Sequence, residues 1–354
     1  MWRIFKRRRA FNSIVVGCLF GALVSRCLRA EDEAPPGGGL REKIRERLKH
    51  GKGASSESQT QATQPTQPTS GPGSSEYPYG SVKTSNFGAG DQEFWIFEPA
   101  DSKPETAPVI VFMHGWSVMD TAPYIDWVNH LVRRGNIVIY PRYQAKLTTA
   151  PATFTPNTVA AIKQALTVLD GADHVHPDRD KVAIVGHSFG GIIAANIAAV
   201  AASEAGMPVF KAVMCVEPGN GGFPVNADYS KIPAKTLLLC VAGDQDKLVK
   251  DKNAKEIFAA STAVAAADKN YILVNSDNHG SPALTADHFA PVAFGWATNA
   301  LDWFGYWKWC DGLTDAAFYG KNRQYALGNT TEQRFMGKWS DGQPVTEPTI
   351  TEAK

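Results

Sequence analysis

The sequence predicts an α/β protein with a mostly parallel central sheet and helices on both faces. Short apolar runs alternate with helical segments along most of the chain. Strands that are apolar at every position are typical of a parallel sheet that is buried on both faces. One of these runs leads directly into a Gly-x-Ser-x-Gly pattern at 186–190. Ligands of such sheets bind at the carboxyl ends of the strands, so we expect the functional residues in the loops that follow them.

Each element is predicted by its own local pattern. Apolar runs of four to six residues predict the strands, which we expect at 93–98, 108–113, 136–140, 182–186, 211–216, 236–241 and 271–274. Amphipathic or alanine-rich stretches predict the helices, which we expect at 124–134, 156–169, 192–202, 251–266 and 291–309. The parallel order brings the loops after four of these strands together on one rim, and the reactive residues discussed below lie in those loops.

The first 30 residues predict a secretory signal. Lys6–Arg9 is a basic stretch, Ala10–Val24 is apolar and uncharged, and Leu28–Ala30 resembles a cleavage site. An apolar run of about 15 residues is shorter than the roughly 20 that a spanning helix needs. The alternatives are an uncleaved membrane anchor and a lipoprotein signal that uses Cys18 or Cys27. We therefore expect an exported protein, either secreted or held in the cell envelope or periplasm.

The remainder of the chain divides into a tether, a domain and a tail. Residues 31–76 combine a short charged helix at 40–50 with a Pro/Thr/Gln-rich stretch, and such a composition buries too little apolar surface to fold. We expect this segment to be a disordered tether, residues 77–345 to be one folded domain, and residues 346–354 to be a disordered tail.

Charge and cysteine content argue neither for a nucleic-acid-binding protein nor for a zinc protein. The formal net charge is +1, but residues 1–30 hold seven basic side chains and no acid. Without them 29 basic and 35 acidic residues remain, a net charge of −6, which gives no argument for nucleic-acid binding. Cys215 and Cys240 fall in predicted strands, so we expect buried thiols there. The alternative is that two of the three cysteines Cys215, Cys240 and Cys310 form a disulfide and the third is a free thiol. The Cys and His spacing suggests no zinc site.

The residues around Ser188 predict a nucleophile elbow. An apolar strand, the sequence Gly186-His187-Ser188-Phe189-Gly190 and an alanine-rich helix follow one another without a break. Strand and helix approach closely at such a turn, which explains a glycine two residues before and two residues after the serine. The turn would place the Ser188 hydroxyl at the carboxyl end of the strand.

A serine hydroxyl needs a base to accept its proton and an acid to orient that base. The loop after the 236–241 strand offers Asp244 and Asp246 as the acid. The loop after the 271–274 strand offers His279 as the base, and we favour His279 because it follows its strand closely. His288, in an Ala-Asp-His-Phe-Ala-Pro segment, is the alternative.

Residues 77 to about 309 resemble an α/β-hydrolase, close to the dienelactone-hydrolase and the cutinase or polyester-hydrolase branches. The matching residues are His114-Gly115-Trp116, Gly186–Gly190, the segment Gly243-x-x-Asp246-x-x-Val249, and His279. The resemblance implies the α/β-hydrolase fold with a catalytic Ser-His-Asp triad in the chain order Ser, Asp, His. It implies Asp246 as the acid, with Asp244 as the alternative. Some relatives carry a His-Phe-Ala-Pro segment around their catalytic histidine, which keeps His288 open.

Acyl transfer also needs N–H donors for the oxyanion that develops on the substrate. We expect the backbone N–H of Phe189, at the start of the helix, to be one donor. By its position in the family, the backbone N–H of Trp116 would be the second. The side chains of Trp116 and Phe189 would line the acyl pocket or simply pack in the core. The resemblance also implies that His114 supports this loop.

These features predict an exported serine carboxylic-ester hydrolase of esterase, lipase or cutinase type. Ser188, His279 and Asp246 would act through an acyl-enzyme on a small or polymeric ester, in a protein that we expect to be a monomer. No phosphate-binding or dinucleotide-binding glycine pattern occurs, so we infer no cofactor and no metal. The alternatives are a serine peptidase or acyltransferase on the same fold, and a non-catalytic binding module tethered to the envelope.

Overall fold

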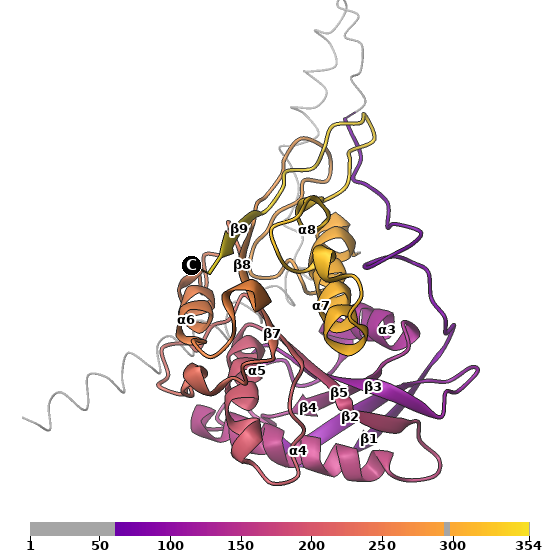
Figure 1. Cartoon of the computed structure of the whole chain (residues 1–354), viewed down its shortest axis with the longest axis vertical. Helices are drawn as coiled ribbons and strands as arrows, with labels where there is room; N and C mark the ends of the chain where they lie inside the picture. The colour runs from indigo at the N-terminus through magenta and orange to yellow at the C-terminus, as the bar shows by residue number, and fades with distance from the viewer. Residues whose placement is uncertain (1–60, 294–297, 354) are drawn as a thin grey trace, which may run out of the picture. The chain divides into compact units, whose positions relative to one another are not determined.

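The computed structural model of the chain describes residues 61–293 and 298–353 (Figure 1). In this part of the chain a nine-stranded sheet has the order β1-β2-β4-β3-β5-β6-β7-β8-β9. The predicted strands appear as β2 (Glu93–Pro99), β3 (Thr106–Met113), β4 (Ile137–Arg142), β5 (His176–His187), β6 (Ala212–Val216), β7 (Leu237–Gly243) and β8 (Lys269–Val274). The six strands from β4 to β8 in this order pair in parallel.

Both edges of the sheet are antiparallel and were not predicted. β1 (Val82–Phe87) pairs with β2, and β9 (Thr349–Glu352) pairs with β8 in the register Ile272↔Ile350. These edge strands are polar and half exposed, so they lack the apolar run that marks the central strands. The expectation of a disordered tail at 346–354 is therefore wrong, because β9 pairs with β8 and Ile350 packs against an apolar cluster.

Helices cover both faces of the sheet and bury a separate apolar cluster on each. On one face lie α4 (Phe154–Leu169), α5 (Phe189–Val200) and α6 (Lys252–Ala260). On the other lie α3 (Ile125–Arg133) and α7 (Trp307–Tyr319), which Figure 1 shows beside each other. Because strand side chains alternate between the faces, an all-apolar strand such as β7 supplies both clusters. The fold is the predicted α/β sandwich, and its rigid centre carries the site.

The folded unit starts well before residue 77. The residues from Ala62 onward form one compact unit, and Ala62 itself is buried. Its carbonyl accepts a hydrogen bond from the Ser281 amide at 2.8 Å, and the Gly73 amide donates to Asp311 at 2.7 Å. From their composition we expected residues 62–76 to belong to a disordered tether. They are instead part of the folded unit. Their order depends on contacts with distant residues, which composition does not reveal. Residues 1–60, with the expected signal and most of the tether, lie outside the described residues.

The C-terminal helix lies further along the chain than predicted. Residues 298 and 299 are not helical, a π-helical turn, η7, spans Asp302–Tyr306, and α7 continues to Tyr319, where Gly320 ends it in the left-handed conformation. A short helix, α8 (Thr331–Arg334), follows.

Among the helices of the described residues, none combines the length and apolar character that a bilayer crossing requires. The three cysteines in this part, Cys215, Cys240 and Cys310, are buried and free, as the first of our two readings expected.

Candidate active site

Ser188 lies at a sharp turn between β5 and α5. Its φ of 57° and ψ of −125° are strained for a residue with a side chain. A Cβ on Gly186 would stand 2.1 Å from the Gly190 carbonyl oxygen, and one on Gly190 would stand 2.3 Å from the Met113 carbonyl oxygen. Both glycines are therefore required by the close approach of the backbone. The turn is the predicted elbow, and it places Ser188 at the carboxyl end of β5.

The imidazole that reaches Ser188 belongs to His288. The Ser188 hydroxyl donates to His288 Nε2 at 2.9 Å, and His288 Nδ1 donates to Asp246 Oδ2 at 2.8 Å. All three side chains are buried, Ser188 and His288 to 2 % exposure. A hydroxyl, an imidazole and a carboxylate in this order are the arrangement of a catalytic triad.

His279, the expected base, lies elsewhere. Its Nε2 donates to Asp341 Oδ2 at 2.7 Å, with side chains 42 % and 44 % exposed. Its backbone amide donates to Asp277, whose other oxygen accepts from the Trp339 indole at 3.1 Å. Asp277 and the C-terminal segment thus hold the first loop after β8 away from Ser188. The expectation of His279 in contact with Ser188 is wrong, and His288, the alternative, occupies that position.

The loop that carries His288 is fixed next to the loop that carries Asp246. The Gln245 amide donates to the Ala286 carbonyl at 3.0 Å. A Cβ on Gly243 would stand 2.2 Å from the same oxygen, so Gly243 permits this approach. The signal in the sequence was the His-Phe-Ala-Pro segment. Distance from the strand end favoured His279 and was misleading, since the chain after β8 makes a further excursion before it returns.

The structure brings Asp246, and not Asp244, to the histidine. Asp246 Oδ1 accepts the amides of Leu248 and Val249 at 2.9 and 3.0 Å, which orients Oδ2 toward His288. Burial by itself would raise the pKa of Asp246, but the hydrogen bond and charge of His288 and the two amides outweigh it, so the pKa is lowered. Asp244 is exposed and accepts from the Ser276 hydroxyl. Asp246 is therefore held ionised beside the imidazole.

His187, next to Ser188, connects two parts of the site. The Gly115 amide donates to the Tyr124 hydroxyl at 3.0 Å, and this hydroxyl donates to His187 Nδ1 at 2.8 Å. His187 Nε2 donates to the carbonyl oxygen of His288 at 2.8 Å. Burial lowers the pKa of His187 to about 4, so the ring is neutral and has one fixed tautomer. The loop at Gly115 and the backbone of His288 are thus positioned by one hydrogen-bonded chain.

One of the two expected oxyanion donors directly follows Ser188, and the other belongs to the residue after Gly115, which passes close to Ser188. Phe189 is the first residue of α5, so its amide has no acceptor within the helix. Gly115 passes close to Ser188, because a Cβ on it would stand 3.4 Å from the Ser188 Cβ. Trp116 follows it, and its ring lies edge-on to Phe223 at 6.3 Å. His114, as expected, supports this loop, because its Nδ1 donates to the Gly115 carbonyl.

The two aromatic side chains near the elbow differ in environment. The ring of Phe189 is 2 % exposed and packs against Phe154, so it belongs to the core rather than to an open pocket wall. Trp116 and Phe223 are both partly exposed. Phe223 comes from the Gly/Pro-rich segment after β6, so that segment does more than connect two strands.

The family comparison agrees with this geometry. Residues 74–233 match the family model described as Chlorophyllase, an α/β-hydrolase-type esterase family. The chain has the α/β-hydrolase fold. The match covers β1 to β6 with the elbow and ends before Asp246 and His288, so it supports an ester hydrolase without testing the last two members of the triad. No curated protein matches the sequence.

Potential metal ligands also occur next to the elbow. His187, Glu217 and His288 each offer one ligand atom, and these atoms lie within 4.8 Å of one another. However, His187 Nε2 donates to the His288 carbonyl, and both ring nitrogens of His288 bind Ser188 and Asp246. A metal ion here would have to displace hydrogen bonds that already build the site. The donor set therefore fits a hydrogen-bonded network better than a metal centre.

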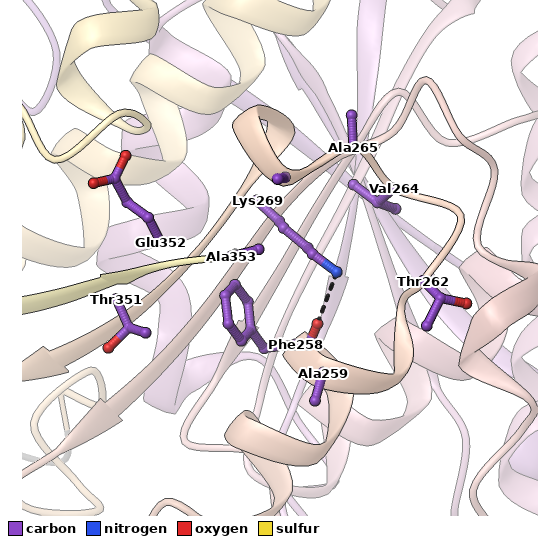
Figure 2. Close-up of a pocket in the computed structure, with 10 residues that line it drawn as sticks. Phe258, Ala259, Thr262, Val264, Ala265, Lys269, Thr351, Glu352 and Ala353 are labelled. Carbon is purple, nitrogen blue, oxygen red and sulfur yellow. Dashed lines mark hydrogen bonds between the residues drawn. The ribbon is translucent and has the colours of Figure 1, made fainter.

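A surface pocket lies away from Ser188. Figure 2 shows it between α6, the start of β8 and β9, with Phe258, Thr351 and Glu352 in its wall. The ammonium group of Lys269 donates to the carbonyls of Phe258 and Ser261, which are orphan acceptors at the end of α6. Lys269 is thus engaged in capping the helix, and we assign the pocket no part in the chemistry.

Proposed function

We propose that this chain is a serine ester hydrolase in which Ser188 is the nucleophile, His288 the general base and Asp246 the acid that orients it. The observation that supports this most is the buried hydrogen-bonded chain from Ser188 through His288 to Asp246, which begins at a strained elbow. The Chlorophyllase match supports ester hydrolysis in general. The fold alone would not be sufficient, since α/β-hydrolase scaffolds serve many functions.

In the proposed mechanism Ser188 Oγ attacks the ester carbonyl while its proton passes to His288 Nε2. Asp246 holds the Nδ1–H tautomer that leaves Nε2 free to accept this proton, and it stabilises the resulting imidazolium. The amides of Phe189 and Trp116 stabilise the oxyanion of the tetrahedral intermediate. His288 then protonates the departing alcohol, which leaves an acyl-serine. Water, deprotonated by the same imidazole, releases the acid and restores Ser188.

We infer that the acyl or alcohol group of the ester lies against Trp116 and Phe223. These two rings are apolar, partly exposed and close to the elbow. Apolar contact of this kind favours an ester with an aliphatic or aromatic group over a charged one. We further propose that the protein is exported through residues 1–30, which determination of the N-terminal sequence of the mature protein would test.

The test is hydrolysis of p-nitrophenyl esters of increasing chain length by the purified protein. We expect Ser188→Ala and His288→Ala each to lower kcat by at least about 10⁴-fold. His279→Ala is the matched control, because it removes an exposed histidine from the same connection. It should retain activity within about threefold.

Loss of activity in His279→Ala with retention in His288→Ala would contradict the base assignment. Full activity in folded Ser188→Ala would contradict the serine mechanism. If the wild-type protein is folded but hydrolyses none of the esters, cleavage of peptide substrates and ligand binding without turnover become the readouts that replace this proposal.

A further inference from the structure

Glu217 is a buried acid at the site that the mechanism above does not use. It follows β6 directly, is fully buried, and has a φ of 45°, a left-handed conformation that few residues with side chains adopt. Its amide donates to the Val241 carbonyl at 2.7 Å. A strained backbone and a buried carboxyl group are each costly, and their coincidence next to a candidate site is a reason to look for a role.

One carboxyl oxygen of Glu217 is held by Tyr306. The Tyr306 hydroxyl donates to Glu217 Oε1 at 3.0 Å, and both groups are buried. Tyr306 is the last residue of η7, the π-helical turn that precedes α7. Turns of this kind rotate the following side chains and occur often at functional sites. Two irregular backbone segments, one after β6 and one before α7, therefore converge on this hydrogen bond.

The other carboxyl oxygen points at the histidines. Among the described residues, Glu217 Oε2 has no hydrogen-bond partner. It lies 3.5 Å from His187 Nε2 and 3.9 Å from His288 Nδ1. The protons on these nitrogens are directed to the His288 carbonyl and to Asp246. Glu217 thus lies close enough to His288 to act on its charge without replacing Asp246 as its hydrogen-bond partner.

We propose that Glu217 is a positioning residue whose free carboxyl oxygen acts electrostatically on His288, so that its protonation state sets how well the site stabilises the imidazolium formed during turnover. This inference rests on the proposed function, because it assumes that His288 is the base.

The charge of Glu217 follows from its surroundings. Burial raises its pKa to about 8, the positive form of His288 lowers it, the charge of Asp246 raises it, and the Tyr306 hydroxyl lowers it. The titratable groups that face the carboxyl group are His187, His288, Asp246, Asp287, Tyr306 and Tyr124. At neutral pH Glu217 is thus mainly uncharged, and it becomes a carboxylate as the pH rises through about 8.

Ionisation of Glu217 should accelerate the reaction. His288 is neutral in the resting enzyme and positive in the transition state, so a second carboxylate 3.9 Å away stabilises the transition state more than the ground state. An opposite charge within about 4–6 Å shifts a pKa by about one to three units, which corresponds to a rate factor of about tenfold at the lower end. Asp246 already supplies one negative charge, so we expect this lower end.

The experiment is the pH dependence of kcat/KM for a neutral ester, corrected for hydrolysis without enzyme. In the wild-type protein we expect a second rise of about tenfold centred near pH 8, above the rate reached at neutral pH. Glu217→Gln keeps the shape of the side chain and its acceptor for Tyr306 but cannot ionise. It should lose the second rise and stay within about threefold of the wild type at neutral pH.

Tyr306→Phe supplies a graded second variant. The Tyr306 hydroxyl lowers the pKa of Glu217, so its removal should move the second rise to higher pH without abolishing it. A role of Glu217 in folding alone would change the amount of active enzyme equally at every pH, and would not move this step.

The outcome separates this inference from the proposed function. If Ser188→Ala and His288→Ala are inactive but Glu217→Gln has the same profile as the wild type, the role of Glu217 is contradicted and the mechanism stands. If Glu217→Gln fails to fold, the Tyr306→Phe profile decides, and an unshifted step contradicts the inference. Full activity of Ser188→Ala would contradict the proposed function itself.

Discussion

In the described part of the chain, a buried chain of hydroxyl, imidazole and carboxylate at Ser188 can be compared with a partly buried one elsewhere, and the one at Ser188 has the surroundings of an active site. At the Ser188 site, the hydroxyl-to-imidazole and imidazole-to-carboxylate distances are 2.9 and 2.8 Å. In a second group, which we name the Tyr77 cluster (Tyr77, His130 and Asp311), they are 3.0 and 2.9 Å. The distances are almost the same, so distances alone do not identify a catalytic group.

The two groups differ in what surrounds the hydroxyl and the carboxylate. Asp311 also accepts from the Gly73 amide and forms an ion pair with Arg134 at 3.2 Å. Burial would raise the pKa of Asp311, but His130 and Arg134 lower it overall. The hydroxyl is a phenol from the N-terminal segment, and it follows no strained turn. The Tyr77 cluster therefore connects α3, α7 and residues 62–77, which is a structural role.

The largest difference between the two groups should appear when Asp246, the proposed catalytic acid, is neutralised. In Asp246→Asn, the side-chain oxygen would stay with the amides of Leu248 and Val249, and the NH₂ group would face His288 Nδ1. The imidazole would then carry its proton on Nε2 and could not accept one from Ser188. We expect kcat to fall by about 10⁴-fold, measured by steady-state ester hydrolysis.

Asp244→Asn is the matched control for this change. It alters an exposed acid in the same loop, and we expect activity within about twofold of the wild type. Equal losses in the two variants would mean that the loop, rather than the carboxylate of Asp246, determines the rate.

The same deletion in the Tyr77 cluster should affect stability instead. Asp311→Ala leaves the buried His130 and the partly buried Arg134 without this acid, and breaking a buried ion pair costs about 3–5 kcal/mol. We expect the free energy of unfolding in urea to fall by this amount. The kcat/KM of the remaining folded protein should stay within about threefold. A large loss of kcat/KM with unchanged stability would show that this cluster takes part in the reaction.

The sequence was sufficient to predict the elements that bury apolar surface. The central strands, from Glu93 to Val274, and the elbow at Ser188 have local patterns, because each strand is apolar and each close approach needs a glycine. Edge strands such as β9 and segments such as 62–76 are held by backbone hydrogen bonds to distant residues. Their side chains are polar, and no local pattern distinguishes them from a linker.

The base could not be selected from the sequence alone. His279 and His288 both follow β8, and the choice depends on the path of the loop between them. That path is set by Asp277, which binds Trp339 and Thr346, and by the Ala286 carbonyl, which binds Gln245. These partners are separated by many residues along the chain. Glu217 was not predicted for a similar reason. Its place at the site depends on the hydrogen bond from Tyr306 and on its distance from the ring nitrogens of His187 and His288.

Two buried histidines near the Ser188 site should make the stability of the protein depend on pH. Burial lowers the pKa of His187 to about 4, and that of His114 likewise to about 4. In the unfolded chain both titrate near about 6.5. The unfolded state therefore binds more protons between these values. The stability from the neutral rings is fully present above about pH 6.5 and is lost as the pH falls through about 4.

The measurement is the free energy of unfolding as a function of pH. Each of these histidines should contribute a slope of up to about 1.4 kcal/mol per pH unit within that window. His187→Asn should reduce the slope by about that amount, whatever its effect on stability at neutral pH. His279→Asn, in the exposed first loop after β8, is the control. An unchanged slope in His187→Asn would contradict the buried neutral state of His187.

The smallest expected effects come from one chemical change made in both groups. Tyr124→Phe removes the hydroxyl that joins the Gly115 amide to His187, and with it the link between the oxyanion loop and the backbone of His288. Tyr77→Phe removes the hydroxyl that joins Gln67 to His130. We expect Tyr124→Phe to lower kcat by about tenfold, because the donors and the base are less well aligned. Tyr77→Phe should lower only the free energy of unfolding, by about 1 kcal/mol.

Both variants lose one hydrogen-bonded phenol hydroxyl, so each controls for the general cost of the deletion. The two readouts are kcat for the ester and the urea midpoint, measured on the same preparations. If Tyr124→Phe changes only the urea midpoint, the chain from Gly115 to His288 is a structural connection like the Tyr77 cluster. If Tyr124→Phe instead lowers kcat without changing the affinity for substrate, the Tyr124 hydroxyl aligns groups that act on the transition state. This alignment is what would distinguish the Ser188 site from the Tyr77 cluster.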